Sequence, residues 1–135
     1  MSRVRHSAVK TTFIAISLSL LAALPAGAAD LVSPVGKWQT ATGESRYEVS
    51  YCGGERQICA KLTWLRSDAR TPENMAYLNR LVVRGAAPVS TNKWTGTIRY
   101  DGQEIPGRMV LEGNDKMVLS GCQLLFCQTV EFERI

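Results

Sequence analysis

Histidine is almost missing from this chain of 135 residues, and its single copy, His6, lies near the N-terminus. Residues 1–28 have the character of a cleavable leader, so the rest of the chain has no histidine. Ser-His-Asp and Cys-His nucleophiles are therefore excluded, as are the common zinc sites that contain histidine. Glu48, Glu131 and Glu133 fall on the presumed outer face, where no acid and base converge. We expect no catalytic residue, no metal site and no cofactor, and we predict that the protein is not an enzyme.

The chain also lacks an apolar run long enough to span a bilayer. The run from Phe13 to Leu24 has about 12 residues, whereas a transmembrane helix needs about 20. Basic residues precede this run, and Pro25 and small residues follow it. This order is typical of a secretory signal peptide rather than of a retained anchor, with cleavage after Ala28 or Ala29.

The part of the chain that remains after cleavage has little net charge. Three of the 16 Lys and Arg lie in residues 1–28 and all 12 acids follow them, so the net charge falls from +4 to +1. Nucleic acid is therefore not an expected partner. Residues 29–135, about 107 in number, suffice for a single domain with a limited core. We expect a periplasmic or secreted domain, present as a monomer or a weak dimer and without a transmembrane segment.

Cysteine is limited to four residues, Cys52, Cys59, Cys122 and Cys127. An even number of cysteines in an exported chain favours two disulfides. A zinc site made of all four is the alternative, but the usual spacing of zinc ligands fits only the second pair.

Apolar and polar residues alternate through most of residues 29–135, and turn residues separate the alternating segments. This pattern predicts short antiparallel strands. About eight of them can close into an up-and-down barrel, whose interior is filled by side chains or holds one small ligand. We predict an all-β fold with one short helix near 71–80, where Thr71 can cap and Pro72 suits the first turn. The expected strands are 36–40, 45–52, 58–66, 81–90, 93–100, 104–112, 116–122 and 127–134.

The same alternation indicates which face each cysteine occupies. All four are expected on the polar face of their hairpins, which favours the sequential pairs Cys52 with Cys59 and Cys122 with Cys127. Such short loops give about 2 kcal/mol per disulfide in the chain-entropy model. Gly96 and Gly107 both fall on the inward-facing positions of their strands. A glycine at such a position indicates that another backbone approaches closely.

The segment Gly36-Lys37-Trp38 resembles the G-x-W motif of lipocalins and the wider calycin superfamily. In those families an arginine near the end of the last strand packs over the tryptophan and closes one end of the barrel. Arg134 shares parity with the inward-facing Val130 and Phe132, so we expect its guanidinium to lie on the face of Trp38 in a cation–π contact.

A resemblance over nearly the whole of residues 29–135 is to domain-of-unknown-function family 2147, a group of small secreted bacterial proteins. It implies a lipocalin-like barrel in the periplasm. The chain departs from the family pattern in a shortened loop at 66–74 and at Phe132, where tryptophan is usual. The motifs that carry the resemblance are Trp38 with Thr40, the Cys52 to Cys59 hairpin followed by Lys61-Leu62-Thr63-Trp64-Leu65, the Pro72 to Arg80 segment, Trp94-Thr95-Gly96-Thr97-Ile98, Ser120-Gly121-Cys122, Gln128-Thr129 and Phe132-Glu133-Arg134.

The first functional hypothesis is a binding module that holds an unknown small apolar or amphipathic molecule inside the barrel. The alternative, that the same aromatic and methionine side chains simply fill the core, is favoured by the short chain. The side chains concerned are Tyr47, Tyr51, Trp64, Trp94, Tyr100, Met109 and Met117.

The second hypothesis is a protein-binding inhibitor or envelope-stress factor whose partner is another envelope protein. Its motivation is the loop 123–126, Gln123-Leu124-Leu125-Phe126, whose apolar residues Leu124, Leu125 and Phe126 lie at a hairpin tip that a flanking pair of cysteines would hold as a contact patch. The alternative, which we favour from the sequence, is that this loop folds back over the mouth of the barrel.

Overall fold

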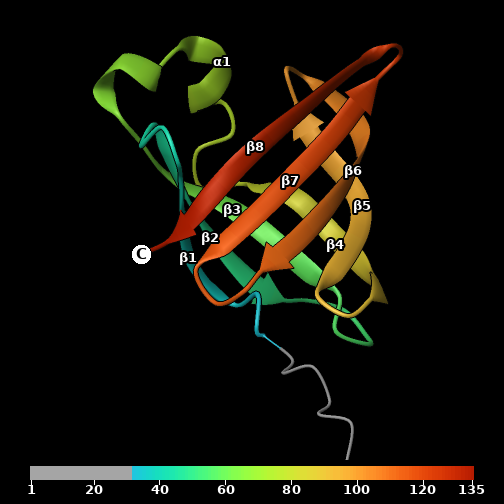
Figure 1. The fold of residues 1–135 in the computed structure, drawn as a ribbon. Helices are drawn as coiled ribbons and strands as arrows, with labels where there is room; N and C mark the ends of the chain where they lie inside the picture. The colour runs from blue at the N-terminus through green and yellow to red at the C-terminus, as the bar shows by residue number, and fades with distance from the viewer. Residues whose placement is uncertain (1–31) are drawn as a thin grey trace, which may run out of the picture.

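Residues 32–135 are described by a computed structural model, and they form eight antiparallel strands closed into one barrel (Figure 1). Each strand pairs with the next, and the last pairs with the first, which confirms the predicted all-β up-and-down barrel. The predicted signal peptide and its cleavage site lie outside the described residues. The strands are β1 (Gly36–Thr40), β2 (Ser45–Tyr51), β3 (Ile58–Leu65), β4 (Leu81–Ser90), β5 (Lys93–Tyr100), β6 (Gln103–Glu112), β7 (Lys116–Gln123) and β8 (Phe126–Arg134).

The β3–β4 connection, residues 66–80, carries the two helical turns of the described structure, the 3-10 turn η1 (Ser67–Ala69) and the short helix α1 (Pro72–Met75). Thr71 caps α1 as predicted, because its hydroxyl accepts from the backbone N–H of Asn74 at 3.2 Å. The short helix predicted near 71–80 is thus confirmed, and its helical residues are Pro72–Met75. Beyond the helix, the backbone N–H groups of Tyr77, Leu78 and Arg80 bond to carbonyls three residues back, as in tight turns. Asn79 has φ of +60° and donates instead to the carbonyl of Leu62. Within the described part of the chain, no helix has the length and apolar character needed to cross a membrane.

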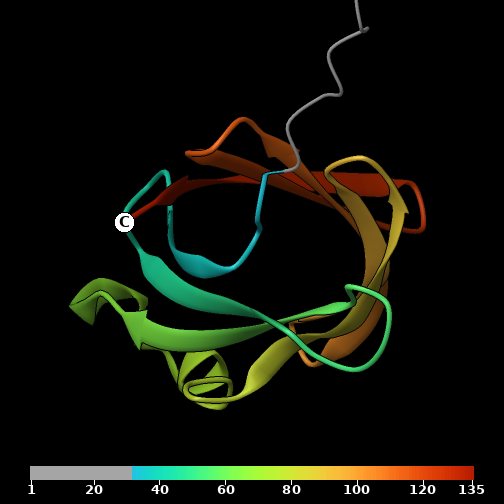
Figure 2. The ribbon, with the colours of Figure 1, turned by 90° about the horizontal axis from the view of Figure 1, so that it is seen from below.

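One end of the barrel is closed by a packed core, and we call it the closed end. It carries the β2–β3, β4–β5 and β6–β7 turns, and Figure 2 shows the segment leading into β1 lying across it. Trp38 and Trp94 are buried here, and their indole N–H groups donate to the carbonyls of Pro34 at 2.9 Å and Arg56 at 3.1 Å. Ile58 is fully buried beside them in the same core.

The closed end is held by a contact between the two ends of the domain. Trp38 of β1 pairs in register with Arg134 of β8, whose guanidinium lies 4.2 Å from the centroid of the indole ring. The guanidinium also donates to the carbonyls of Val35 at 2.8 Å and Ser33 at 2.7 Å, and its Nε donates to the carbonyl of Asn114 at 2.6 Å. This is the contact that the resemblance of the G-x-W segment implies.

Three neighbouring glycines let the wall of the barrel curve. Gly96, Gly107 and Gly121 lie side by side on β5, β6 and β7. A Cβ atom at Gly96 would lie 2.8 Å from the Cα of Ala86, and one at Gly107 would overlap the side chain of Ile98. The neighbouring groups therefore occupy the space of the missing side chains, as their inward position predicted.

A β-bulge changes the parity of β3 and overturns one predicted position. Arg46 pairs with Trp64, whereas Tyr47 pairs with Leu62, so Thr63 is an extra residue in β3. Trp64 therefore lies on the outer face, with the Arg46 guanidinium 4.4 Å from its ring, and not in the interior. Tyr51 was also misplaced, because it stands at the end of β2 with 48% of its surface exposed.

The disulfides join Cys52 with Cys59 and Cys122 with Cys127, which are the two predicted pairs. Cys59 differs from the expectation that every sulfur lies on the surface. It is buried, because β4 runs beside it and the backbone N–H of Gly85 donates to its sulfur at 3.4 Å.

We predict that Arg134→Ala lowers the free energy of unfolding by about 3 kcal/mol, since it removes a cation–π contact and hydrogen bonds from a charged donor. Arg134→Lys keeps the charge but not the planar fork that reaches several carbonyls at once, and we expect it to recover less than half of the loss. Urea denaturation of the three proteins checks this. A lysine variant as stable as the parent would show that charge alone closes the barrel.

A second stability test concerns the glycine row. Gly96→Ala should destabilise the protein by about 2 kcal/mol, because the new methyl group meets backbone atoms of β4 that cannot rotate away. Gly54→Ala is the matched control, because no atom lies within 4 Å of the Cβ position there. Equal effects of the two substitutions in thermal or urea unfolding would argue against the close approach at Gly96.

Candidate functional site

The interior of the barrel above the closed-end core holds a cavity of about 580 Å³. This volume lies within the range of about 300 to 1,000 Å³ that is common for small-molecule sites. A smaller hollow of about 90 Å³ extends it toward the β7–β8 turn and shares part of its lining. The residues common to both are Ile98, Tyr100, Leu119, Gln128 and Val130.

The wall of the cavity along β5 to β8 is apolar. Ile98 on β5, Leu119 on β7 and Val130 on β8 face inward, because each alternates with an outward polar residue and the paired strands keep that parity. Met109 and Met117 line the cavity near the closed-end core, where both are buried. This side of the cavity offers a ligand a continuous aliphatic surface.

The mouth of the cavity is polar and contains more acids than bases. Glu44, Glu73 and Asp101 line it together with a single arginine, Arg99. Arg99 is engaged in an ion pair on its own sheet, with its Nε 3.1 Å from a carboxylate oxygen of Glu104. Within residues 32–135 neither Glu73 nor Asp101 has a basic side chain at ion-pair distance, so a bound molecule would meet unneutralised carboxylates.

Arg66 fixes one side of this mouth. Its guanidinium binds both carboxylate oxygens of Asp68, at 2.6 and 2.8 Å, and donates to the backbone carbonyl of Thr42 in the β1–β2 turn at 2.9 Å. The hydrogen bond from Arg66 lowers the pKa of Asp68. Since Arg66 touches both connections, it holds the start of the β3–β4 connection against the β1–β2 turn.

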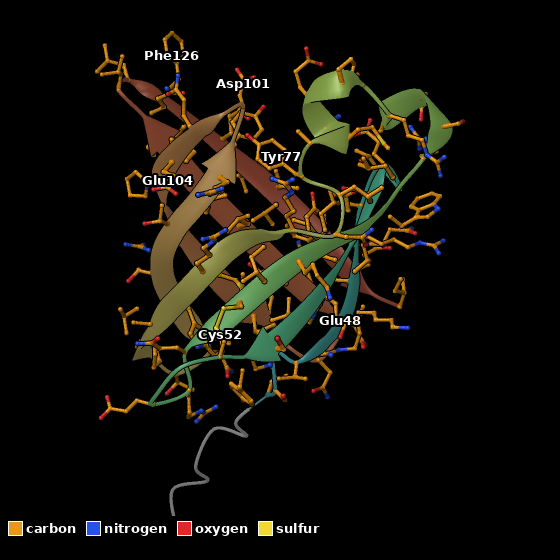
Figure 3. The ribbon with its side chains drawn as sticks, turned by 180° about the vertical axis from the view of Figure 1, so that it is seen from behind. Glu48, Cys52, Tyr77, Asp101, Glu104 and Phe126 are labelled. Atoms are coloured by element: carbon orange, nitrogen blue, oxygen red, sulfur yellow. A yellow bond between two sulfur atoms is a disulfide. The ribbon has the colours of Figure 1, made fainter. Side chains whose placement is uncertain are left out.

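Tyr77 fixes the other side of the mouth. Figure 3 shows Tyr77 beneath the helical segment and close to Asp101 in the β5–β6 turn. The phenol oxygen accepts a hydrogen bond from the backbone N–H of Gly102 at 2.6 Å. The β3–β4 connection is therefore attached to the barrel at both of its sides, and its polar residues Glu73 and Asn74 reach the cavity.

Tyr47 supplies a polar group inside the barrel. Its ring meets Phe132 edge to face, with centroids 5.4 Å apart, and its hydroxyl accepts from the hydroxyl of Ser45 at 3.2 Å. Burial is the main cause that raises the pKa of Tyr47, so the phenol is neutral in the folded protein at physiological pH. A ligand would find a hydroxyl group here rather than a charge.

The structure brings together four of the seven side chains named as possible ligand contacts. Tyr47, Tyr100, Met109 and Met117 line the cavity. Trp94 lies in the closed-end core, whereas Tyr51 and Trp64 do not face the cavity. The core-filling alternative thus describes the closed end but not the space above it.

Sequence reasoning missed the aliphatic wall and the acidic mouth. The alternation of polar and apolar residues places Ile98, Leu119 and Val130 on the inner face. The ligand contacts predicted from the sequence were, however, only aromatic or sulfur-containing side chains. Glu73 and Asp101 carry no such signal, because they belong to connections that the fold alone brings to one cavity.

The apolar turn between β7 and β8 does not fold back over the mouth. Leu124 and Leu125 are each 95% exposed, and Phe126 is 79% exposed. Only Phe126 reaches the smaller hollow, together with Gln123. The expectation that this loop covers the barrel is therefore wrong for both leucines.

The fold and the cavity define a small antiparallel barrel that is packed at one end and hollow toward the other. A family model described as "uncharacterized protein conserved in bacteria (DUF2147)" matches residues 36–134. The chain belongs to this family, which the match over all eight strands shows. No curated protein and no solved structure matches the chain.

The raised pKa of Tyr47 predicts a loss of stability in alkali. The unfolded chain loses the phenol proton near about pH 10, whereas the folded state still holds it, so the free energy of unfolding falls as pH rises above that value. Tyr47→Phe keeps the ring and should show a shallower fall between about pH 9 and 11. Tyr51→Phe is the control on an exposed ring and should follow the parent. Parallel profiles for the parent and Tyr47→Phe would refute the assignment.

Proposed function

We propose that the protein is an exported, non-catalytic barrel that binds a small apolar or amphipathic molecule in its cavity. The observation that carries this proposal is the cavity of about 580 Å³ between the closed-end core and the open end. A short barrel that only filled its core would leave no such space, because protein interiors are otherwise packed to crystal density.

Export is supported by two independent features. The first is the order of charged, apolar and small residues in 1–28, which is that of a secretory signal. The second is the pairing of all four cysteines in disulfides, a state that persists in oxidising compartments. We therefore assign the protein to the periplasm or the extracellular space. The closure of the barrel by Trp38 and Arg134 further supports a lipocalin-like architecture.

The distribution of polarity in the cavity favours a ligand with two unlike ends. The wall formed by Ile98, Leu119 and Val130 suits a hydrocarbon or aromatic portion. The carboxylates of Glu73 and Asp101 at the mouth would repel an anionic head group and accept an uncharged or cationic one. We infer an amphipathic ligand whose apolar part lies toward the closed end.

The proposal predicts that the neutral fluorescent probe N-phenyl-1-naphthylamine binds to the purified protein. Val130→Trp should weaken this binding about tenfold or more, because its side chain fills space that the probe needs. Thr129→Trp is the matched control, because Thr129 is the preceding residue of β8 and pairs with Ser120 on the outer face. Fluorescence titration of the three proteins measures the effect. Equal affinities of the two tryptophan variants would contradict binding in the cavity.

A second probe tests the inferred head group. 1-Anilinonaphthalene-8-sulfonate has the same aromatic skeleton with a sulfonate added, and we expect it to bind more weakly than the neutral probe.

Native mass spectrometry of protein recovered from its own cell envelope should then show a bound species that dissociates on denaturation. A cavity that excludes both probes, in protein that carries no bound species, would refute the proposed function.

A further inference from the structure

The β7–β8 turn presents an uncharged, apolar protrusion at the open end of the barrel. We call Leu124, Leu125 and Phe126 the hydrophobic tip; their exposed fractions are 95%, 95% and 79%. No charged residue occurs between Met117 and Val130. Figure 1 shows the β7–β8 hairpin extending away from the body of the barrel, and Figure 3 places Phe126 at its extremity.

The backbone of the tip is unfavourable for the residue it carries. Leu124 has φ of +55°, and among residues 32–135 it is the only apolar residue other than glycine that has a positive φ. Leu125 has no positive φ, so this two-residue turn is of the type that has glycine at its first central position, whereas the β5–β6 turn has positive φ at both Asp101 and Gly102. A leucine at such a position costs conformational energy, so the tip keeps an apolar side chain where local structure disfavours one.

Covalent and polar contacts hold the base of the tip in place. Cys122 and Cys127 are joined on either side of it, and the side-chain amide of Gln123 donates to the side-chain carbonyl of Gln103 on β6. The tip is therefore presented on a fixed support, and ordering it on binding costs little entropy.

We propose that the hydrophobic tip inserts into the surface of a lipid bilayer. A specific protein interface buries about 800 Å² from each partner, whereas three side chains of this size offer only a few hundred Å². Leucine is also under-represented among the residues that dominate protein interfaces. A convex tip requires a pocket in a protein partner, but a bilayer deforms around it without one.

The charges near the tip indicate which bilayer it prefers. Asp101 and Glu104 belong to the open-end part of the neighbouring β5–β6 hairpin, where Arg99 forms an ion pair with Glu104, and Glu73 lies on the same mouth. These carboxylates would be repelled by an anionic surface. We therefore assign the tip to zwitterionic lipid, bound by burial of apolar side chains rather than by attraction between charges.

Insertion of the tip would bring the mouth of the cavity to the lipid surface. Phe126 lines the smaller hollow, which shares its lining with the main cavity, so the tip and the cavity are adjacent. The inference stands whether or not the cavity takes a ligand, since the tip is exposed outside it.

The test is co-sedimentation of the purified protein with phosphatidylcholine vesicles. The protein keeps the N-terminus that the producing cell leaves on it. We expect binding that salt does not weaken and that Leu125→Ser reduces about tenfold. Leu124→Gly should reduce binding to a similar extent while leaving the melting temperature unchanged or higher, because glycine accepts the positive φ. A loss of vesicle binding without a loss of thermal stability would distinguish a membrane-docking role of Leu124 from a role in folding.

Val89→Ser is the control, because Val89 is an exposed aliphatic side chain, 56% exposed, that lies away from the tip, on β4 at the closed end. It should bind vesicles as the parent does. The proposal is overturned if the parent does not bind, if Val89→Ser loses as much binding as Leu125→Ser, or if binding requires phosphatidylglycerol and disappears at high salt. It is also overturned if size-exclusion chromatography shows a dimer that Leu124→Gly dissociates, since the tip would then join two copies. Leu124→Gly should still bind N-phenyl-1-naphthylamine, so failure of the tip and failure of the cavity are distinguishable.

Discussion

Pairing of the first strand with the last is the constraint on which the rest of this structure depends. β1 has only five residues, yet it closes the sheet by pairing with β2 on one side and β8 on the other. Arg134 strengthens this closure because it binds carbonyls that lie about 100 residues earlier in the chain, as well as the face of Trp38. Since closure removes the open edges, it fixes the number of strands around the barrel and thereby the space inside it.

The side chains then divide that space along the axis of the barrel. Two tryptophans and Ile58 fill the closed end, where the segment before β1 covers them. Nearer the open end the inward positions of β5, β7 and β8 hold isoleucine, leucine and valine. These side chains are smaller and leave the cavity between them. The closed end is therefore filled by side chains, whereas the part of the barrel above it encloses the cavity.

Much of this fold can be predicted from the sequence, because the alternation of polar and apolar residues with period two depends only on neighbouring residues. Strand positions, the pairing of cysteines and the inward glycines all follow from it. Trp64 was misplaced because a single extra residue, Thr63, reverses parity without altering the local pattern. The cavity could not be predicted, since it depends on the difference between the volume enclosed and the volume of all inward side chains. The acidic mouth is equally non-local, because Glu44, Glu73 and Asp101 come from three different connections.

The open end departs from what stability alone would select. Glu73 and Asp101 stand there without a basic partner among the described residues, a hollow is left unfilled, and Leu124 adopts a conformation that suits glycine. Each of these features costs free energy in an isolated protein, and such departures from local preference are expected where a surface meets something else. The closed end, with its tryptophans, the Arg134 contact and the half-buried disulfide of Cys52 and Cys59, supplies the stability that makes them tolerable. The barrel is thus asymmetric in function because it is asymmetric in packing: one end stabilises the fold, and the other presents its cavity and its apolar tip to the surroundings.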